Sequence, residues 1–353
     1  MGKRNGVFRN TDAIQLTADV MKHLDTEPDE FIFGSTQQYG QQGYNFTRQA
    51  ALAAGFDPAI PSLTVNRLCG SAMSAVHVAF SNCAMGLAST VVVGGTEHMT
   101  GNPMTEHWYQ IPGKINTAMA QGSALMGLTA EMVAKLNKVS RKSQDEFALR
   151  SHLLAAEHMK GDINVFSLGH DSRTGTLRQI REDEGVRADA SLEGLRKLRG
   201  AFDPRGSVTA GNSSGIADGS SGLVVTTDTA LARARIAGVG VTAGDPATMG
   251  LQPINAIKKA LENASIDIND VGAWELNEAF AAQAVPVVST LGIDLAKVNT
   301  MGGAIACGHP LGSSGTRIIH TLLTRMEKDD VSVGVAAMCV GMGQGIATVI
   351  ERT

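Results

Sequence analysis

The sequence lacks the features that mark several specialised classes of protein. Only 4% of its 353 residues are aromatic, its formal net charge is -4, and it has no sustained run of Lys and Arg of the kind found on nucleic-acid surfaces. No apolar stretch is long enough to span a bilayer, and the N-terminus lacks the apolar core of a signal peptide. These absences predict a soluble, cytoplasmic protein.

Cysteine is also scarce, and its four positions exclude two further classes. Cys69, Cys83, Cys307 and Cys339 are too few for a disulfide scaffold, and their spacing is not that of a paired zinc site. Cys307 lies two residues before His309, but no second pair with ligand spacing follows, so we expect no metal. Cys83 falls within a predicted helix and is assigned to the core.

What the sequence does contain is a large hydrophobic fraction, 43%, arranged in two similar series of strands and helices. From residue 230 onward, the periodicity predicts strands at 236–241, 272–275, 331–338 and 346–351, and helices at 254–261, 279–291 and 313–326. The front of the chain repeats this order, with helices at 12–23, 46–54 and 71–85, and strands at 31–33, 63–65, 90–93 and 223–226.

This repeat predicts an α/β protein of two similar layered halves, each built on a mostly parallel sheet. The first half comprises residues 1–100 plus 217–233, and the second comprises residues 234–353. Residues 101–216, rich in Met, Gly and charge, are expected to form an inserted lobe. The second half starts with a strand before its first helix, whereas the first half starts almost directly at its helix. We therefore expect one buried strand to be missing from the first half, upstream of Met1.

Three residues lie in Gly-rich loops at the C-terminal ends of predicted strands, where open α/β sheets place their sites: Cys69, His309 and Cys339. Cys69 opens a helix, whose N-terminal N–H groups and dipole are expected to favour the thiolate. His309 can remove the thiol proton. Each residue alone would more often be structural, but the three together indicate a reactive cysteine, a base and a second cysteine in one cleft.

Four segments that contain these residues closely resemble the signature blocks of the thiolase family. They are Arg67-Leu68-Cys69-Gly70-Ser71, Asn277-Glu278-Ala279-Phe280, the run from Gly302 to Pro310, and the run from Cys339 to Gly345. The runs Met126 to Glu131 and Val208 to Gly215 look like the blocks of the family's inserted lobe. The resemblance covers nearly the whole chain, and is strongest to the degradative branch that includes the thiolase subunits of bacterial fatty-acid oxidation complexes.

The resemblance implies a five-layered αβαβα fold and a two-step exchange of acyl groups. Cys69, deprotonated by His309, would attack the 3-keto carbonyl, and Cys339 would protonate the departing acetyl-CoA carbanion. CoA would then take the acyl group from Cys69. One oxyanion hole would combine His309 with a water held by Asn277, and the other would use the backbone N–H groups of Cys69 and Gly341.

The same resemblance implies a substrate channel. Met126, Ala210, Ser214 and Phe280 would line the path of the pantetheine and acyl groups. Leu125 stands where short-chain biosynthetic relatives carry a His that contacts CoA, which favours longer substrates. Independently of the resemblance, their residue types and position also predict that Asn277 and Glu278 cap the helix that follows them.

The phosphates of CoA need cations, and the lobe offers candidates among which the sequence does not choose. They are Arg173, Arg178, Arg181, Arg187, Arg196, Lys197, Arg199 and Arg205.

The implied activity is that of a 3-ketoacyl-CoA thiolase of fatty-acid β-oxidation, with two alternatives. One is a biosynthetic acetoacetyl-CoA thiolase, and the other is an inactive lipid-binding or scaffold subunit. A decarboxylating ketosynthase is disfavoured, because that family pairs its cysteine with two histidines and Cys339 stands in place of the second. No metal or redox cofactor is expected, since side chains can run both steps with CoA as a substrate. The expected assembly is a homodimer or homotetramer, or a hetero-oligomer with a hydratase/dehydrogenase subunit.

Overall fold

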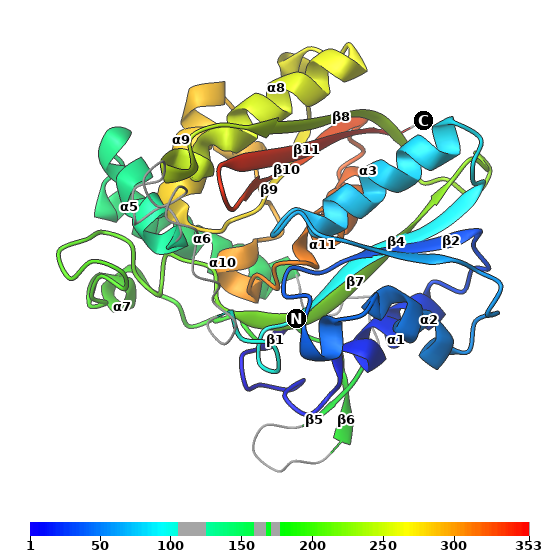
Figure 1. Ribbon diagram of the computed structural model, residues 1–353. Coiled ribbons are helices and arrows are strands. Elements are labelled where there is room, and N and C mark those ends of the chain that lie inside the picture. Colours follow the sequence, from blue (N-terminus) through cyan, green and yellow to red (C-terminus); the bar gives the residue numbers. More distant parts are fainter. Residues whose placement is uncertain (105–124, 159–166, 171–176, 353) are drawn as a thin grey trace, which may run out of the picture.

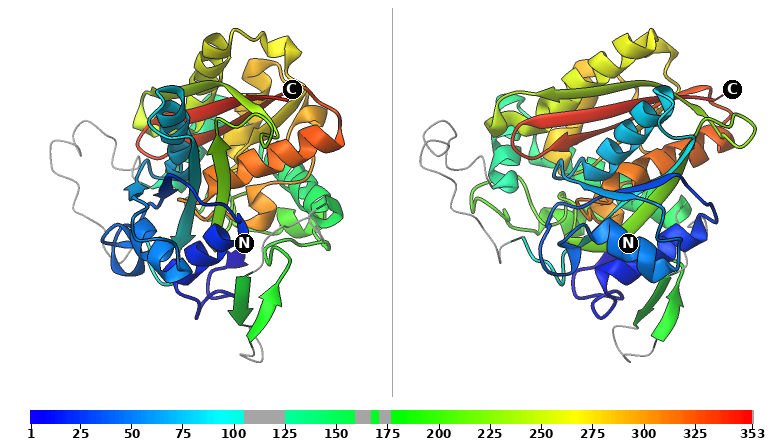
Figure 2. Two further views of the ribbon diagram at one scale, coloured as in Figure 1. Left: turned by 90° about the vertical axis from the view of Figure 1, so that its right-hand side faces the viewer. Right: turned by 45° about the vertical axis from the view of Figure 1, so that its right-hand side comes forward.

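The structure, a computed structural model, describes residues 1–104, 125–158, 167–170 and 177–352, and these residues stack in five layers (Figures 1 and 2). The outer layers are α1 (Ala13–His23) with α2 (Phe46–Ala54), and α8 (Gln252–Ala264) with α9 (Ala281–Leu291). The central layer is α3 (Ser71–Ala84) and α11 (Ser314–Lys328), with one sheet on each side. The expected αβαβα architecture is confirmed.

Each half of the repeat supplies one sheet. The first has the strand order β1-β7-β4-β2-β3, formed by β1 (Gly2–Lys3), β2 (Glu30–Gly34), β3 (Ser62–Val65), β4 (Thr90–His98) and β7 (Ala217–Thr226). The second has the order β8-β11-β10-β9, formed by β8 (Arg235–Ala243), β9 (Ala273–Leu276), β10 (Val333–Val340) and β11 (Gln344–Glu351). In the repeat, β7 therefore corresponds to β11, β4 to β10, and α3 to α11.

The expectation of mostly parallel sheets is wrong. β10 and β11 pair antiparallel, as do β11 and β8, and only β9 runs parallel to β10 in the second sheet. The first sheet is mixed in the same way, because β4 pairs antiparallel with β7. Residues 341–343 alone join β10 to β11, and so short a connection forms a hairpin, whereas a parallel pair needs a long crossover.

The core of the central layer fixes the helix that follows Cys69. Ile318, Leu322 and Met326 repeat every four residues along α11 and are buried in one cluster with Met73 of α3. Burying each such side chain contributes roughly 1.5–3 kcal/mol. A Cβ at Gly315 would lie 2.2 Å from the backbone N of Met73, so the two helices meet at a distance that only glycine permits.

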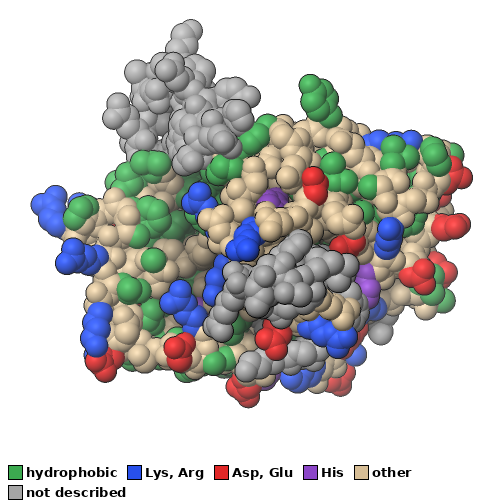
Figure 3. Space-filling model, turned by 90° about the horizontal axis from the view of Figure 1, so that it is seen from below, with side chains coloured by type: hydrophobic (Ala, Val, Ile, Leu, Met, Phe, Trp, Pro, Cys, Tyr) green, Lys and Arg blue, Asp and Glu red, His purple; other side chains and the backbone are tan. Residues whose placement is uncertain are grey.

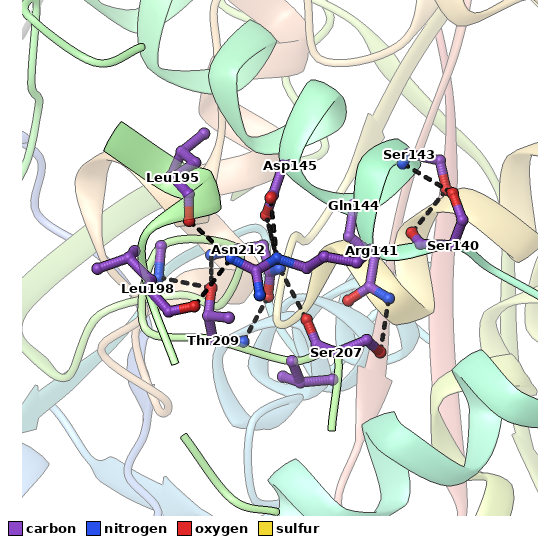
Figure 4. A network of polar contacts seen from close by, with 12 residues as sticks. Ser140, Arg141, Ser143, Gln144, Asp145, Leu195, Leu198, Ser207, Thr209 and Asn212 are labelled. Carbon is purple, nitrogen blue, oxygen red and sulfur yellow. Dashed lines mark hydrogen bonds and ion pairs between the residues drawn. The ribbon is translucent and has the colours of Figure 1, made fainter. Parts of the chain in front are cut away.

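The segment predicted to form an inserted lobe contains α5 (Met126–Leu136), α6 (Arg141–His158), β5 (Ser167–His170), β6 (Leu177–Ile180) and α7 (Leu192–Arg196), with the three helices at the left of Figure 1 and the two strands at its bottom. Its interior holds the polar network of Figure 4. Arg141 forms an ion pair with Asp145, whose Oδ1 accepts from Nδ2 of Asn212 at 3.0 Å. Arg141 also donates to the carbonyl of Leu195. The network fixes the segment that leads to Ser214.

Five short helices complete the described elements: η1 (Gly40–Gln42), η3 (Pro246–Leu251), η4 (Ile268–Asp270), η5 (Leu295–Lys297) and α10 (Ala304–Cys307). Of these, α10 lies inside the Gly-rich run before His309, where the periodicity predicts no helix. No helix in the described part of the chain is both long enough and apolar enough to cross a membrane.

The two halves differ at the strand that the sequence analysis expects to be missing. In the second half, β8 pairs with β11 along its whole length, from Gln344 to Glu351. In the first half, β1 pairs with the corresponding strand β7 only at Ala217 and Asp218.

Candidate active site

A tight turn between β3 and α3 presents Cys69. The Oγ of Ser71 accepts a hydrogen bond from the backbone N–H of Arg67 at 2.9 Å and donates to the carbonyl of Leu68 at 2.6 Å. Leu68 has φ +48°, a left-handed conformation that costs a non-glycine residue free energy. The turn therefore holds Cys69 in a fixed position immediately before the helix.

Cys69 and Cys339 meet at one site, although 270 positions separate them in the sequence. The backbone N–H of Gly341 hydrogen-bonds to the sulfur of Cys69, and the charge of a Cys69 thiolate raises the pKa of Cys339. Cys339 is the next-to-last residue of β10 and is only 2% exposed. A Cβ at Gly341 would lie 3.1 Å from Leu68 and 3.7 Å from the sulfur of Met126, so the backbone approaches the first half closely here.

The expectation that the helix N-terminus favours a Cys69 thiolate is wrong. The pKa of Cys69 is raised to about 11, chiefly by burial and in smaller part by the charge of Glu97, while the backbone N–H groups of Gly341 and Cys69 only partly oppose the rise. Desolvation disfavours the charged form of a thiol, and here it outweighs the donors at the start of α3. The resting nucleophile is therefore a thiol at neutral pH.

This pKa predicts how alkylation of Cys69 depends on pH. Because only the thiolate reacts with iodoacetamide, the rate of inactivation should still rise steeply between pH 8 and pH 9.5, since both values lie below the pKa of about 11. A free thiol with a pKa of roughly 8.5 levels off over the same range. The rate of inactivation by iodoacetamide, measured at each pH beside the rate of alkylation of N-acetylcysteine, checks this prediction. An inactivation rate that no longer rises above pH 8.5 would contradict it.

His309 and Asn277 form a second buried pair. Nδ2 of Asn277 lies 3.3 Å from Nε2 of His309, and Nδ1 of His309 lies 2.6 Å from Oγ of Ser314. Because the Ser314 hydroxyl donates to the carbonyl of Pro310 at 3.0 Å, it accepts from Nδ1–H of His309. Nε2 is thereby left as the basic nitrogen of the imidazole.

The same surroundings keep His309 uncharged. Burial, and secondly the positive charge of Arg317, together lower its pKa to about 3. A lowered pKa means that the neutral form persists above pH 3, so His309 is able to accept a proton throughout the neutral range.

Asn277 and Glu278 do not cap the helix that follows them, contrary to the sequence-based expectation. Helix α9 begins at Ala281 with Phe280 as its N-cap, and no side chain caps it. Instead, Glu278 accepts hydrogen bonds from Ser151, Asn299 and the backbone N–H of Ile305. The backbone N–H of Asn277 bonds to the carbonyl of Ala337 in β10 at 2.9 Å, which places Asn277 two residues from Cys339 across the sheet.

Two of the five channel residues lie with Cys339, and three lie outside its cluster. Met126 and Phe280 pack with Cys339 in one apolar cluster, and Phe280 also contacts Phe202 edge to face with ring centroids 5.9 Å apart. The backbone N–H of Ser214 bonds to Ala279, next to Phe280, at 3.0 Å. Ala210 is exposed, and Leu125 is 48% exposed at the start of α5.

Two features of this site were missed by reading the sequence. Ser314 orients the imidazole of His309. The sequence signals this role only by placing a hydroxyl residue five positions after His309, at the start of a predicted helix. Arg317, 8% exposed, donates to Oδ1 of Asn277 at 3.4 Å, one helical turn beyond Ser314. Neither residue falls in the four blocks that resemble the thiolase family.

Among the described residues, the remaining two cysteines form no hydrogen bond to Cys69, Cys339 or His309. Cys83 is partly buried beside the central core, and Cys307 is buried with Ala155 and Ala306. Within the described ranges, no group of three or more His, Cys, Asp and Glu side chains could hold a metal ion.

Of the candidate cations for CoA, Arg173 and the side chain of Arg178 lie outside the described residues. Seen from below, Lys and Arg side chains gather along the edge of the molecule that belongs to the lobe (Figure 3).

The fold and the site agree with comparisons to known proteins. The N-terminal domain of thiolase matches residues 1–229, and the C-terminal domain of thiolase matches residues 230–352. This chain therefore belongs to the thiolase family, whose members are acyltransferases.

Similar proteins cover the chain from end to end. It is 45% identical to a 3-ketoacyl-CoA thiolase of Pseudoalteromonas translucida and 46% identical to one of Shewanella loihica, with 100% of this chain and 96% of each relative covered. Among solved structures, human mitochondrial 3-ketoacyl-CoA thiolase is 30% identical with a TM-score of 0.89, and covers 100% of this chain and 96% of its own. An acetyl-CoA acetyltransferase of Bacillus anthracis is 33% identical, with the same TM-score and coverage.

Proposed function

We propose that this protein is a 3-ketoacyl-CoA thiolase of fatty-acid β-oxidation. It uses CoA to cleave a 3-ketoacyl-CoA into acetyl-CoA and a shortened acyl-CoA. The observation that carries the proposal is the meeting of Cys69 and Cys339 beside the N–H of Gly341. The names of the relatives that are 45% and 46% identical over the full chain support the same substrate class.

In the first step, Nε2 of His309 takes the proton of the Cys69 thiol as the sulfur attacks the 3-keto carbonyl. The bond between C2 and C3 then breaks, and its electron pair stays on C2. Cys339 gives its proton to C2, and acetyl-CoA leaves. The acyl group remains on Cys69 as a thioester, and Cys339 is left as a thiolate.

In the second step, the Cys339 thiolate takes the proton of incoming CoA. The CoA thiolate attacks the thioester carbonyl, and the sulfur of Cys69 leaves and recovers its proton from His309. The shortened acyl-CoA departs, and both cysteines and the histidine have returned to their starting forms. Each proton has a named donor and acceptor, so the cycle closes with side chains alone.

Each step places negative charge on a carbonyl oxygen, and two sets of donors are available for it. Asn277 and His309 would stabilise the oxyanion of the first step with a bound water. The backbone N–H groups of Cys69 and Gly341 would stabilise that of the second, and the N–H of Gly341 already donates to the Cys69 sulfur. Because the resting thiol and imidazole are both neutral, we propose that proton transfer accompanies attack on the carbonyl.

The alternative is a biosynthetic acetoacetyl-CoA thiolase that runs the same chemistry toward condensation. Similarity to an acetyl-CoA acetyltransferase structure keeps this second function open. Leu125, exposed at the start of α5, lacks the ring nitrogen that a histidine would offer to CoA at this position. This difference favours the degradative function.

Chain length distinguishes these two functions. We expect kcat/KM for thiolysis of a long-chain 3-ketoacyl-CoA to exceed that for acetoacetyl-CoA. Loss of the 3-ketoacyl-CoA enolate absorbance measures both substrates in one assay. A strict preference for acetoacetyl-CoA would support the biosynthetic alternative.

We further propose that the protein acts in the cytoplasm with CoA as a substrate and no other cofactor. Its assembly would be a homodimer or homotetramer, or a complex with a subunit that carries hydratase and dehydrogenase activities. Native mass spectrometry of the protein purified from its own cells separates these assemblies.

A further inference from the structure

A connected series of hydrogen bonds runs through the site from Arg317 to Pro310. Nη2 of Arg317 lies 3.4 Å from Oδ1 of Asn277, and Nδ2 of Asn277 lies 3.3 Å from Nε2 of His309. Nδ1 of His309 lies 2.6 Å from Oγ of Ser314, whose hydroxyl donates to the carbonyl of Pro310 at 3.0 Å. The imidazole proposed as the base therefore lies in the middle of the series.

The two ends of the series fix the direction in which its bonds point. A guanidinium has N–H donors and no acceptor, and it keeps its proton in proteins. The atom of the Asn277 amide that faces Arg317 is therefore the oxygen, and the NH₂ group is left to donate to Nε2 of His309. At the other end, the carbonyl of Pro310 can only accept, so Ser314 accepts from Nδ1–H. Both ends demand the same tautomer of His309, with the proton on Nδ1 and the lone pair on Nε2.

An asparagine amide by itself would not choose between the two directions. Its oxygen and its NH₂ group have nearly the same shape, so a half-turn of the amide exchanges a donor for an acceptor at the same position. With its oxygen toward His309, Asn277 would draw the imidazole proton to Nε2. The hydroxyl of Ser314 would permit this change, because a hydroxyl both donates and accepts. Nε2 would then be unable to take the proton of the Cys69 thiol.

A second role for Arg317 would be that of a counter-ion to buried carboxyl groups. The pKa of Glu275 is raised to about 8, chiefly by burial, and the charges of Arg317 and Arg325 only partly oppose the rise. Both arginines belong to α11, and they are 8% and 4% exposed. Arg325, however, donates to the carbonyl of Lys297 and forms an ion pair with Asp329. The two arginines therefore share the effect on Glu275, and the contact with Asn277 distinguishes Arg317.

We propose that Arg317 is a positioning residue, which turns the Asn277 amide so that its NH₂ group faces His309 and thereby keeps the imidazole proton on Nδ1. The proposal rests on the thiolase function proposed above. Through its contact with Asn277, Arg317 prepares both the base and the amide that would hold the water of the first oxyanion hole.

The tautomer of His309 can be measured in the resting enzyme without substrate. Solid-state ¹⁵N NMR of protein labelled at histidine distinguishes a protonated ring nitrogen from one with a free lone pair, and the signal lost in His309→Asn identifies this residue. In the parent at pH 7, Nδ1 should carry the proton. Arg317→Met, which has no donor, should move a substantial part of the population to Nε2–H. A parent with its proton on Nε2, or no shift in Arg317→Met, would overturn the proposal.

Arg325→Met is the matched control, because it removes a buried arginine of the same helix whose charge also acts on Glu275. It should lower the thermal unfolding temperature and leave the tautomer of His309 unchanged. Arg317→Lys keeps a cation that only donates, and it should retain more of the Nδ1–H tautomer than Arg317→Met does. An equal shift in the two methionine variants would overturn the proposal, since loss of a counter-ion would then explain both.

The rate at which acetyl-CoA acetylates Cys69 in a single turnover gives a second readout. Because a base held in the wrong tautomer loses roughly 10⁴-fold in rate, and part of the population would keep the productive tautomer, Arg317→Met should slow acetylation on the order of 10²-fold. KM for acetoacetyl-CoA should change much less than kcat. An acetylation rate equal to that of the parent would overturn the proposal.

Failure of the thiolase function would give a different result. A parent that neither acetylates Cys69 nor cleaves a 3-ketoacyl-CoA would refute that function, and the NMR comparison would still decide whether Arg317 sets the tautomer. An active parent whose Arg317→Met variant keeps both tautomer and rate would refute the role of Arg317 alone. If Arg317→Met does not fold, Arg317→Gln replaces it, because a second amide can donate or accept and should produce the same shift toward Nε2–H.

Discussion

Replacing Cys69 by alanine should lower kcat for thiolysis of acetoacetyl-CoA by a factor on the order of 10⁴ or more. The acyl group would then have no attachment point, and Cys339, 2% exposed at the end of β10, is buried behind the position of Cys69. The variant should fold as the parent does, because alanine fills most of the same space at a turn held by Ser71 and Leu68. Steady-state thiolysis and the thermal unfolding temperature together test both expectations.

The matched control for this experiment is Cys83→Ala, which removes a thiol from the far end of the same helix, α3. Its activity should stay close to that of the parent. Mass spectrometry after mixing with acetyl-CoA should find an acetyl group on Cys69 in the parent and in the control. Appreciable turnover by the Cys69→Ala variant, or acetylation at Cys83, would refute the assignment of the nucleophile.

Replacing His309 by asparagine should lower kcat/KM by roughly 10²–10⁴-fold, the usual contribution of a general base. The loss should appear in the rate at which Cys69 is acetylated in a single turnover, because Nε2 of His309 takes the thiol proton in that step. Raising the pH toward 9.5 should restore part of this rate, since hydroxide then supplies some of the thiolate. The parent should gain less over the same range.

His77→Asn is the matched control for the base. His77 is partly buried, with a pKa lowered to about 4 by desolvation, and its Nε2 lies 2.9 Å from Oγ1 of Thr348 rather than in the site. This substitution should lower stability and leave the acetylation rate nearly unchanged. If both histidine variants slowed acetylation alike, the effect of His309 would be structural and not that of a base.

The positions of the helices and strands could be predicted from the sequence because they depend on local periodicity. Helix α1 begins at Ala13 after an Asp12 cap and ends at His23, as the apolar spacing indicates. The outer helix α9 ends at Leu291 before Gly292, which takes φ +65°. The meeting of Cys69 and Cys339 was also predicted, because the repeat places both loops at strand ends.

What the sequence could not predict depends on neighbours that are distant in the chain. The predicted direction of β11 was wrong, because an apolar run has the same sequence pattern whether its partner strand is parallel or antiparallel. The predicted ionisation state of Cys69 was wrong. A helix N-terminus is a local feature that the sequence reveals, whereas desolvation comes from the packing of the other half around the sulfur. Arg317 reaches Asn277 from α11, and no spacing within one segment reveals that contact.

The protonated state of Cys69 also bears on how the enzyme withstands oxidants. Peroxide converts thiolates to sulfenic acid, and susceptibility follows the fraction of thiolate and its exposure. A cysteine that stays a thiol until a ketone arrives presents little anion for peroxide to attack. The burial that raises its pKa to about 11 thus protects the sulfur between turnovers. A thiolase with this arrangement relies on a sulfur nucleophile without constant repair of the enzyme.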